Sequence, residues 1–378
     1  MHNVLLLGAG KIGGAIAKFL ADTGDYHVRV ADQDEDALGR LPKSDAIEPK
    51  AMSVTDPAQL AEAMKDRHSA MSAVSFDANP AIAQAALDAG ANYLDLTEDV
   101  ITTKKVRDIA AKAKEGQRFI PQCGLAPGFV SIAAYDLAKK FDELHRLHLR
   151  VGALPIFPTN ELKYNLTWST DGLINEYGNP CEAVVEGKMI DVLPLEGLEQ
   201  FSLDGVMYEA FNTSGGVGTL AETLAGECRR LDYKTMRYRG HRDLVKFLMF
   251  DLRMNEHRDD LKTIFERAIP MTPQDVVLIF CTAVGKVNGQ LMQMTDARKV
   301  YHGEFRGLDL SGIQITTAAA ICAVLDLIRE DKLTTKTGFV KQEEIALDDF
   351  LANRFGQCYA TGRENVEEIE SPYVPSVV

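Results

Sequence analysis

A glycine-rich segment near the start of the chain has the spacing of a dinucleotide-binding turn. Gly8, Gly10 and Gly13 form the pattern G-x-G-x-x-G, with Lys11 and Ile12 between the last two glycines. An apolar run typical of a buried strand precedes the pattern, and helix-favouring residues follow it. In that context the first glycine permits a tight turn, the second lets a pyrophosphate approach the backbone, and the third lets helix and strand pack closely. The segment predicts a dinucleotide site; a flavin site or a turn without ligand are the alternatives.

An acidic residue follows at the spacing where such sites bind a ribose. Asp32 comes at the end of the second predicted strand, directly after His27–Ala31, roughly 20 residues beyond the fingerprint. Its carboxylate would accept hydrogen bonds from ribose hydroxyls and would repel a 2′-phosphate, and the next four residues include no basic side chain. We therefore expect NAD as the cofactor, with NADP less favoured; a helix-capping role for Asp32 is the alternative.

Further polar residues follow the later predicted strands of this half. Ligands of open α/β sheets bind beyond the carboxyl ends of the strands. We therefore expect Ser75, Phe76 and Asn79 beside the nicotinamide ribose, although Asn79 could simply cap a helix. Asp95 and Glu98 follow the next strand, and either could hold a substrate ammonium or act as a base. A solvated loop acid is the alternative for each.

A glycine-proline turn marks the junction of the two halves. Cys123 directly follows the predicted strand Arg118–Gln122 and leads into this turn, which contains Gly124 and Pro127. We expect all three residues to wall the nicotinamide and to contact the substrate. The thiol itself is expected to pack rather than to react, because hydride transfer needs no nucleophile.

Two segments of the second half carry groups that suit a carboxylate. Ser214, Gly215 and Gly216 offer a hydroxyl and free N–H groups, which suggests an anion-binding nest. Arg237 could bind a carboxylate, and His241 could move a proton. The alternatives are a plain loop, a surface ion pair for Arg237 and a helix cap for His241.

Four stretches of the chain resemble one family. They are ANYLDLTE at residues 91–98, QCGLAPG at 122–128, WSTDGLINEY at 168–177, and TSGG at 213–216 with YKTMRYRGH at 233–241. Together they resemble the saccharopine dehydrogenase-like family over about residues 1 to 350, and its lysine 6-dehydrogenase branch most closely.

The resemblance implies an NAD(P)-dependent dehydrogenase acting on CH–NH or CH–NH2 donors, with lysine or a lysine-derived amine as substrate. Hydride leaves a carbon only when the attached nitrogen is neutral, so a base must first take the ammonium proton. We assign carboxylate binding to Arg237 with the Ser214–Gly216 backbone, and amine handling to Glu98 with His241. A carboxynorspermidine-type polyamine dehydrogenase and a non-catalytic NAD-binding sensor are the alternatives.

The order of predicted elements indicates how these residues are positioned. Strands and helices alternate over residues 1–125, which predicts an α/β fold with a Rossmann-type doubly wound parallel sheet. Residues 126–309 suggest an inserted α+β substrate domain, with strands at Tyr164–Ser169 and a hairpin turning at Asn288-Gly289. The apolar helix Thr316–Arg329 predicts a return to the nucleotide domain over about residues 310–350. A polar tail is expected over residues 356–378.

Bulk composition limits the possible partners. The 378 residues carry a formal net charge of −14, which disfavours nucleic acid and anionic membranes and leaves a small molecule as the expected partner. Six cysteines without a C-x-x-C spacing suggest free thiols and a cytoplasmic location. His145 and His148 lack an apparent third ligand, so we expect no metal. A homodimer is the default expectation for such a fold.

Overall fold

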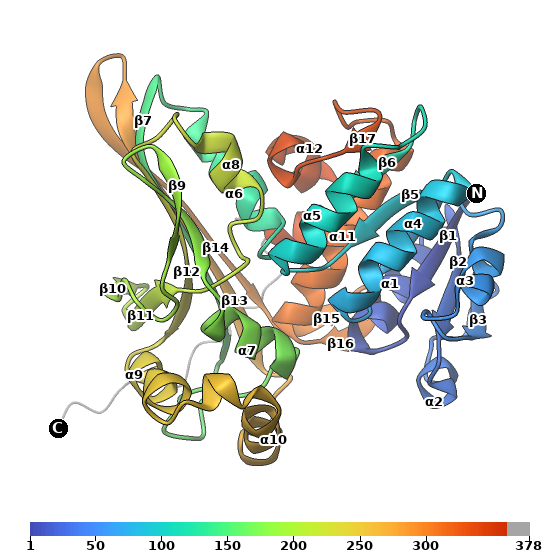
Figure 1. Ribbon diagram of the computed structural model, residues 1–378, viewed down its shortest axis with the longest axis horizontal. Coiled ribbons are helices and arrows are strands. Elements are labelled where there is room, and N and C mark those ends of the chain that lie inside the picture. Colours follow the sequence, from blue (N-terminus) through green and yellow to red (C-terminus); the bar gives the residue numbers. More distant parts are fainter. Residues whose placement is uncertain (361–378) are drawn as a thin grey trace.

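The computed structural model describes residues 1–360, and its first part is a parallel sheet with helices on both faces (Figure 1). The strand order is β17-β6-β5-β4-β1-β2-β3, and every paired neighbour is parallel. The order reverses between β1 and β4, which is the switch point where ligands of such sheets bind. The strands are β1 (His2–Leu7), β2 (Tyr26–Asp32), β3 (Ile47–Ala51), β4 (Ser69–Ser72), β5 (Asn92–Asp95), β6 (Arg118–Ile120) and β17 (Gly338–Phe339).

Alternating side chains of β1 explain why both faces of this sheet are covered. Val4 and Leu6 pack into one core cluster, and Leu5 and Leu7 pack into another on the opposite face. The first cluster includes the apolar side of α1, and the second includes α3, α4 and α5. The helices of this part are α1 (Lys11–Ala21), α2 (Glu35–Gly39), α3 (Pro57–Met64), η1 (Phe76–Ala78), α4 (Asn79–Ala89) and α5 (Val100–Ala110).

A larger mixed sheet forms the second domain. Its order is β10-β11-β12-β7-β13-β14, and β8 pairs with β12 and β9. Its strands are β7 (Glu143–Pro155), β8 (Cys181–Val185), β9 (Lys188–Val192), β10 (Glu199–Leu203), β11 (Val206–Asn212), β12 (Arg230–Tyr238), β13 (Asp275–Val287) and β14 (Gln290–Tyr301). The helical segments of this domain are α6 (Phe129–Ala138), α7 (Thr170–Gly178), α8 (Leu220–Leu224), α9 (His241–Lys246), η2 (Phe247–Asp251), η3 (Met254–Glu256) and α10 (Arg258–Ala268).

The hairpin predicted at Asn288-Gly289 is confirmed, because β13 and β14 pair antiparallel around it with φ values of 51° and 77° at the turn. The expectation of a strand at Tyr164–Ser169 is wrong. That segment is irregular apart from one bridge between Leu166 and Met271. Asp171-Gly172, a pair typical of turns, lies inside α7.

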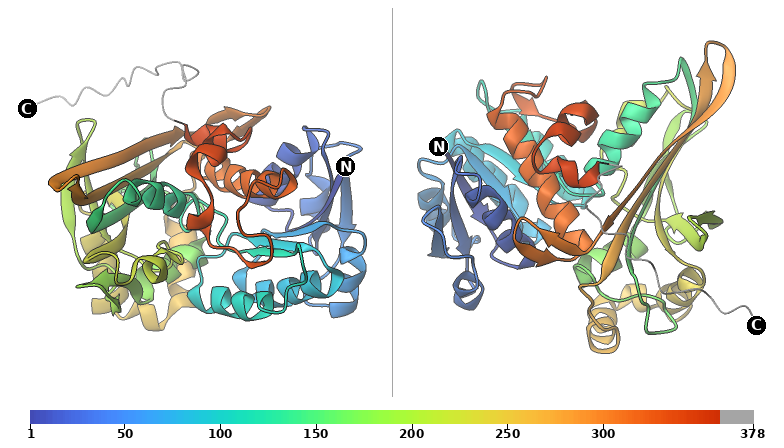
Figure 2. Two further views of the ribbon diagram at one scale, coloured as in Figure 1. Left: turned by 90° about the horizontal axis from the view of Figure 1, so that it is seen from above. Right: turned by 180° about the vertical axis from the view of Figure 1, so that it is seen from behind.

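The chain then returns to the nucleotide-binding sheet. A short hairpin, β15 (Gly303–Phe305) and β16 (Leu308–Leu310), precedes α11 (Gly312–Arg329), which lies between the two sheets and packs on α1 (Figures 1 and 2). Ser311 begins the helix with a capping box to Gln314. By length and composition α11 could cross a membrane, but 78% of it is buried in the fold, as in a core helix.

The carboxyl-terminal elements pack around α11. They are η4 (Gln342–Glu344), α12 (Leu347–Ala352) and η5 (Gly356–Tyr359). Tyr359 is buried and stacks on Phe129 with ring centroids 3.9 Å apart. The expectation of a tail from residue 356 is therefore wrong for these first residues, because an aromatic side chain anchors them. Residues 361–378 of that expected tail lie outside the described residues.

Candidate active site

A cavity of about 600 Å³ lies at the carboxyl ends of the parallel strands, between the two domains. The nucleotide domain contributes four loops, at residues 10–13, 73–76, 96–98 and 124–127. The second domain faces them with β7, β12, the loop before α7 and α7 itself, and the first turns of α11 close one side. The cavity therefore collects residues from the segments that follow β1, β4, β5 and β6, as expected for a doubly wound sheet.

The glycine-rich turn has the shape of a phosphate cradle. A Cβ on Gly8 would lie 2.6 Å from the Ala73 carbonyl oxygen, and one on Gly13 would lie 1.9 Å from the Gly8 oxygen. No atom lies within 4 Å of the Cβ position of Gly10, which faces the cavity together with Lys11 and Ile12. Gly8 and Gly13 thus permit close packing, and Gly10 leaves the helix N-terminus open to an anion.

Asp32 lies beside this turn, at the end of β2. Its Oδ2 accepts a hydrogen bond from the Ala9 amide at 2.7 Å, and its Oδ1 accepts one from the Asp34 amide at 2.9 Å. The side chain is only partly buried, so its carboxylate remains accessible next to the glycines. Arg40 is the nearby base, and it is exposed and lies 3.9 Å from the Asp34 carboxylate.

The segment after β4 is split between the cavity and the core. Ser75 and Phe76 line the cavity as expected. Asn79 does not, because it is buried and its Oδ1 accepts a hydrogen bond from the Ser72 hydroxyl at 2.6 Å. The placement expected for Asn79 beside the nicotinamide ribose is therefore wrong; the amide holds the end of β4 to α4.

The two acids after β5 have different roles. Asp95 is fully buried and accepts hydrogen bonds from the Tyr93 hydroxyl and from the Thr97 and Gln122 amides, at 2.8–3.0 Å. Burial raises its pKa to about 6, and those bonds oppose the shift. The expectation that Asp95 handles the amine is wrong, because its carboxylate ties β5 to β6 and does not line the cavity.

Glu98, by contrast, lines the cavity. Its carboxylate makes no hydrogen bond or ion pair with another described residue, and burial raises its pKa above the ordinary value. The carboxylate lies near Trp168, since a Cβ on Gly172 would be 3.3 Å from Glu98 Oε1 and 2.4 Å from the indole ring. An indole face beside a carboxylate is a suitable environment for a cationic nitrogen.

A second acid, Glu176 on α7, faces the same cavity and was missed by the sequence analysis. It is buried, and its carboxylate has no hydrogen-bond partner among residues 1–360. Burial raises its pKa to about 8; Arg237 opposes this shift and Glu98 adds to it. A pKa near neutrality in a cavity is the property expected of a general base.

Arg237 lies on β12, and only 2% of it is exposed. Its Nε donates to the Tyr177 hydroxyl at 2.8 Å and its Nη1 donates to the Met236 carbonyl at 2.9 Å. Nη2 has no partner among the described residues, and Arg237 lines the cavity. The guanidinium thus retains a free donor for an anionic group of a ligand.

His241 lies behind Arg237 and does not line the cavity. Its Nδ1 is 2.7 Å from the Leu162 carbonyl and its Nε2 is 3.1 Å from the Tyr177 hydroxyl. Burial, and then the charge of Arg237, lower its pKa to about 3. The expected role of His241 in moving a substrate proton is wrong, because both ring nitrogens are occupied and the ring is neutral.

Some residues of the turn at the domain junction line the cavity, and others lie in the core. Gly124 and Pro127 line the cavity as expected. Cys123 does not: its thiol is buried, donates to the Ile120 carbonyl at 3.0 Å and accepts from the Gln342 amide at 3.2 Å. Burial raises the pKa of this thiol well above its usual range. The expectation that Cys123 contacts the substrate is therefore wrong.

The Ser214–Gly216 segment supports the site from behind. None of its residues lines the cavity, and the Ser214 hydroxyl donates to the Pro180 carbonyl at 2.9 Å. A Cβ on Gly215 would lie 2.5 Å from the Glu98 carbonyl oxygen, and one on Gly216 would lie 2.2 Å from the Tyr233 ring. The expectation of a carboxylate nest is wrong; the glycines instead let Glu98 and Tyr233 pack closely.

Within residues 1–360, three buried groups in the loop before α7 have no hydrogen-bond partner. They are the Tyr164 hydroxyl, the Asn165 Oδ1 and the Thr167 Oγ1. Thr167 and Trp168 line the cavity, as do Ile313, Gln314 and Thr317 at the start of α11. None of these residues was among the predicted site residues.

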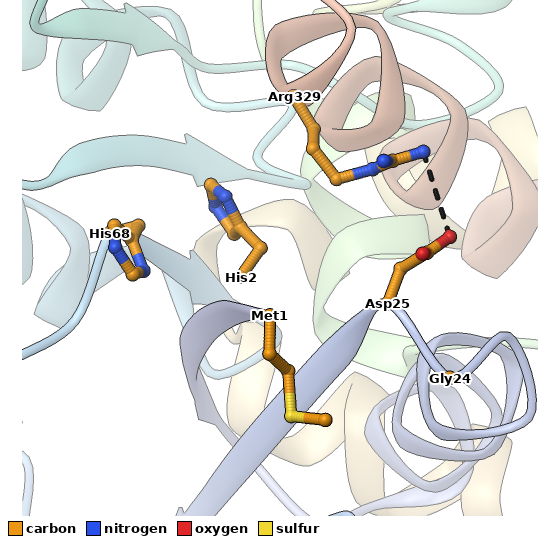
Figure 3. A pocket seen from close by; sticks show the side chains of 6 residues that line it. All are labelled: Met1, His2, Gly24, Asp25, His68 and Arg329. Atoms are coloured by element: carbon orange, nitrogen blue, oxygen red, sulfur yellow. Dashed lines mark ion pairs between the residues drawn. The ribbon is translucent and has the colours of Figure 1, made fainter.

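A second cavity, of about 420 Å³, lies at the opposite, amino-terminal edge of the parallel sheet (Figure 3). Its polar groups already have protein partners: His2 Nε2 lies 2.9 Å from the Ser69 hydroxyl, and Asp25 pairs with Arg329 and Arg354. These pairs hold β2 to α11 and the carboxyl-terminal segment. Within residues 1–360 no group of three or more metal-ligating side chains is found, and His148 instead contacts Asp232.

The fold and the glycine-rich cavity define a Rossmann-type nucleotide-binding protein with a second domain that completes the site. A family model described as "Saccharopine dehydrogenase NADP binding domain" matches residues 4–120. A second, "Saccharopine dehydrogenase C-terminal domain", matches residues 124–355. The chain therefore belongs to the saccharopine dehydrogenase family.

Curated relatives agree with this family. The chain is 23% identical over 205 residues to saccharopine dehydrogenase [NADP(+), L-glutamate-forming] of Schizosaccharomyces pombe, which covers 51% of this chain and 44% of that protein. It is 22% identical over 197 residues to the mitochondrial alpha-aminoadipic semialdehyde synthase of Mus musculus, covering 50% of this chain and 21% of that protein. The chain thus covers less than half the length of either relative.

Solved structures share the fold over nearly the whole chain. The apo saccharopine dehydrogenase (L-Glu forming) of Saccharomyces cerevisiae has a TM-score of 0.75 and 17% identity, covering 90% of this chain and 94% of that chain. The homospermidine synthase of Legionella pneumophila, in complex with NAD, has a TM-score of 0.65 and 12% identity, covering 95% and 89%. The expected α/β fold, a doubly wound sheet with an α+β domain, is confirmed.

Proposed function

We propose that this protein is a nicotinamide-dependent oxidoreductase that acts on the C–N bond of lysine or a lysine-derived amine. The observation that carries the proposal is a single cavity in which a dinucleotide cradle on one wall faces a buried arginine, a buried acid and a half-buried acid, none of which forms an ion pair within residues 1–360. Membership of the saccharopine dehydrogenase family supports the reaction class.

The residues present fit a dinucleotide. Gly10, Lys11 and Ile12 would hold the pyrophosphate at the N-terminus of α1, and Asp32 would accept hydrogen bonds from the adenosine ribose. Ser75, Gly124 and Pro127 would wall the nicotinamide. When bound, the nicotinamide supplies the acceptor for a hydride from the substrate carbon.

Two acids, one from each domain, can prepare the amine. The substrate nitrogen must be neutral before its carbon can release a hydride. Glu176, with a pKa of about 8, would take the proton from the ammonium at its carboxylate oxygen. Glu98, beside Trp168, would hold the nitrogen while it carries positive charge.

The balance of charge in the cavity favours lysine among the candidate amines. The acids that line the cavity are Glu98, Asp171 and Glu176, and Asp171 pairs with Lys262 outside it. The basic residues of the lining are Lys11, in the nucleotide turn, and Arg237. Saccharopine has more carboxylates than amines, lysine has more amines than carboxylates, and polyamines have amines alone. One free arginine with two free acids matches lysine.

A polyamine is the second candidate, since an acid-rich cavity also suits it and homospermidine synthase shares the fold. Arg237 decides between the two, because a polyamine offers no carboxylate to its free Nη2. A screen of NAD reduction with lysine, saccharopine, diaminopimelate and polyamines tests the proposal. Greatest kcat/KM with lysine supports it, and turnover of polyamines alone replaces it with the second candidate.

We propose NAD as the preferred cofactor. Asp32 presents its carboxylate beside the glycine turn, where it would repel a 2′-phosphate, and Asp34, Glu35 and Asp36 follow it. The description of the matching family model names NADP, and Arg40 is the nearby residue that could accept its extra phosphate. Comparing kcat/KM for NAD and NADP on the best amine distinguishes the two cofactors.

A further inference from the structure

We propose that Tyr177 and His241 are positioning residues that aim the Arg237 guanidinium into the cavity, and that they thereby set the preference for a substrate with a carboxylate. Neither side chain lines the cavity. The inference rests on the proposed function, because it assigns Arg237 the substrate carboxylate.

The directions of the hydrogen bonds in this chain of residues are fixed by chemistry. The Leu162 carbonyl can only accept, so His241 Nδ1, at 2.7 Å, carries the proton. Since the ring is neutral, Nε2 is then an acceptor, and the Tyr177 hydroxyl donates to it across 3.1 Å. Arg237 Nε–H donates to the same hydroxyl oxygen at 2.8 Å. Each hydrogen bond in this chain therefore has only one possible donor and one possible acceptor.

Because these side chains are buried, water cannot replace the hydrogen bonds between them. The exposed fractions of Tyr177, His241 and Arg237 are 0%, 1% and 2%. The Tyr164 ring lies under the guanidinium with its centroid 4.8 Å from Cζ, which restricts rotation out of the plane. With Nε on Tyr177 and Nη1 on the Met236 carbonyl, Nη2 is the nitrogen whose two N–H groups both remain for a ligand. A guanidinium held in this way binds a carboxylate in a defined direction.

The chain of bonds also connects the guanidinium to the loop that carries Trp168. Leu162 belongs to the irregular segment between β7 and α7, and Thr167 and Trp168 of that segment line the cavity. Arg237 and Trp168, which would contact the two ends of a lysine-like substrate, are thus both connected to the segment that contains Leu162.

Removing the Tyr177 hydroxyl leaves Arg237 Nε without its acceptor. The Arg237 guanidinium is then no longer held in one orientation. We expect Tyr177→Phe to raise KM for lysine about 10-fold with little change in kcat. Pentane-1,5-diamine has the amines of lysine without its carboxylate, so its kinetic constants should stay the same. His241→Asn should shift the lysine preference in the same direction by a smaller factor.

The test compares kcat and KM for lysine and pentane-1,5-diamine in wild type, Tyr177→Phe, His241→Asn and a matched control. Tyr359→Phe is the control, because it removes a buried hydroxyl that donates to the Thr316 carbonyl and belongs to a residue outside the cavity lining. Loss of the preference for lysine in the first two variants alone is the expected result. Equal losses for both amines, or no change for either, would overturn the positioning role.

A measurement without turnover separates this inference from the proposed function. The Arg237 Nε–H should exchange slowly with solvent in 15N NMR spectra of the wild-type protein, and about 10-fold or more faster in Tyr177→Phe. If neither amine reduces NAD in wild type, the proposed function fails and this exchange rate decides the inference by itself. Equal exchange in the two proteins would overturn it.

Discussion

Glu176 and Arg237 face one cavity from α7 and β12 and influence each other's charge, but they do not form an ion pair. A buried acid and a buried cation normally pair when nothing separates them, because each charge is costly to bury alone. Their separation within a cavity therefore leaves a place where a ligand with both an ammonium and a carboxylate can satisfy the two groups.

The first prediction concerns Glu176 as the base. We expect Glu176→Gln to lower kcat/KM for lysine about 100- to 10,000-fold, since general base catalysis contributes that range. In wild type kcat/KM should rise with pH up to about 8, where Glu176 loses its proton. Rates measured across pH check this. A variant that keeps wild-type activity would show that Glu176 is not the base, and Glu182→Gln, outside the lining, is the control.

The same substitution should stabilise the protein without substrate. The pKa of Glu176 is raised in the folded state, so the folded protein holds a proton that the unfolded chain releases above pH 4.5. Stability should fall as pH rises from about 4.5 to 8 in wild type, and this part of the pH dependence should vanish in Glu176→Gln. Near pH 7 the variant should be more stable by about 1–3 kcal/mol. Chemical unfolding at several pH values measures the difference, and parallel pH curves would contradict the burial of an uncompensated carboxylate.

Arg237 should carry the binding of the carboxylate. We expect Arg237→Ala to cost about 2–4 kcal/mol of transition-state binding for lysine, or roughly 30- to 1000-fold in kcat/KM. Steady-state kinetics on the best substrate, with circular dichroism to verify the fold, provide the measurement. A change below about threefold in a folded variant would place the carboxylate elsewhere.

Asp32 should set the choice of cofactor. Replacing Asp32 with Ser and Gln33 with Arg removes a charge that repels a 2′-phosphate and adds one that attracts it. We expect the ratio of kcat/KM for NAD to that for NADP to fall by about 10-fold or more. A wild-type protein that already prefers NADP would refute the role given to Asp32.

Local pattern was sufficient to predict the nucleotide-binding half. The glycine spacing, the strand before it and Asp32 after β2 are contiguous features whose geometry follows from short-range sterics. Glu98 and Arg237 were also placed correctly in the cavity. Glu98 follows the end of a predicted strand, whereas Arg237 was selected for its charge within the YKTMRYRGH segment and not from a predicted strand.

The errors arose where a partner distant in sequence decided which way a side chain points. Asp95 is held by the Gln122 amide and Asn79 by Ser72. Each bond joins two different elements, so the residue pattern of one strand does not predict it. His241 depends on Tyr177 and Leu162 in the same way. Glycines at the Ser214–Gly216 segment suggested an anion nest, but they serve close packing against Glu98 and Tyr233.

Glu176 was missed for a local reason. Asp171-Gly172 and Gly178-Asn179-Pro180 are strong turn signals, and they concealed the nine-residue helix α7 between them. Gly172 is there because a Cβ would collide with the Trp168 ring, so the glycine reports packing rather than a turn. Helical spacing from Leu173 and Tyr177, which both pack inward, could have placed Glu176 on the inner side of a helix.

Transfer of label from lysine to the cofactor tests the central claim most directly. The wild-type protein is incubated with NAD and L-lysine carrying deuterium at the ε-carbon, and the reduced cofactor is isolated and examined by mass spectrometry. The proposed function predicts that deuterium appears in the reduced nicotinamide and that turnover is slower than with unlabelled lysine. NAD that binds but is reduced by neither lysine, saccharopine nor a polyamine would contradict the claim and would indicate a non-catalytic NAD-binding sensor.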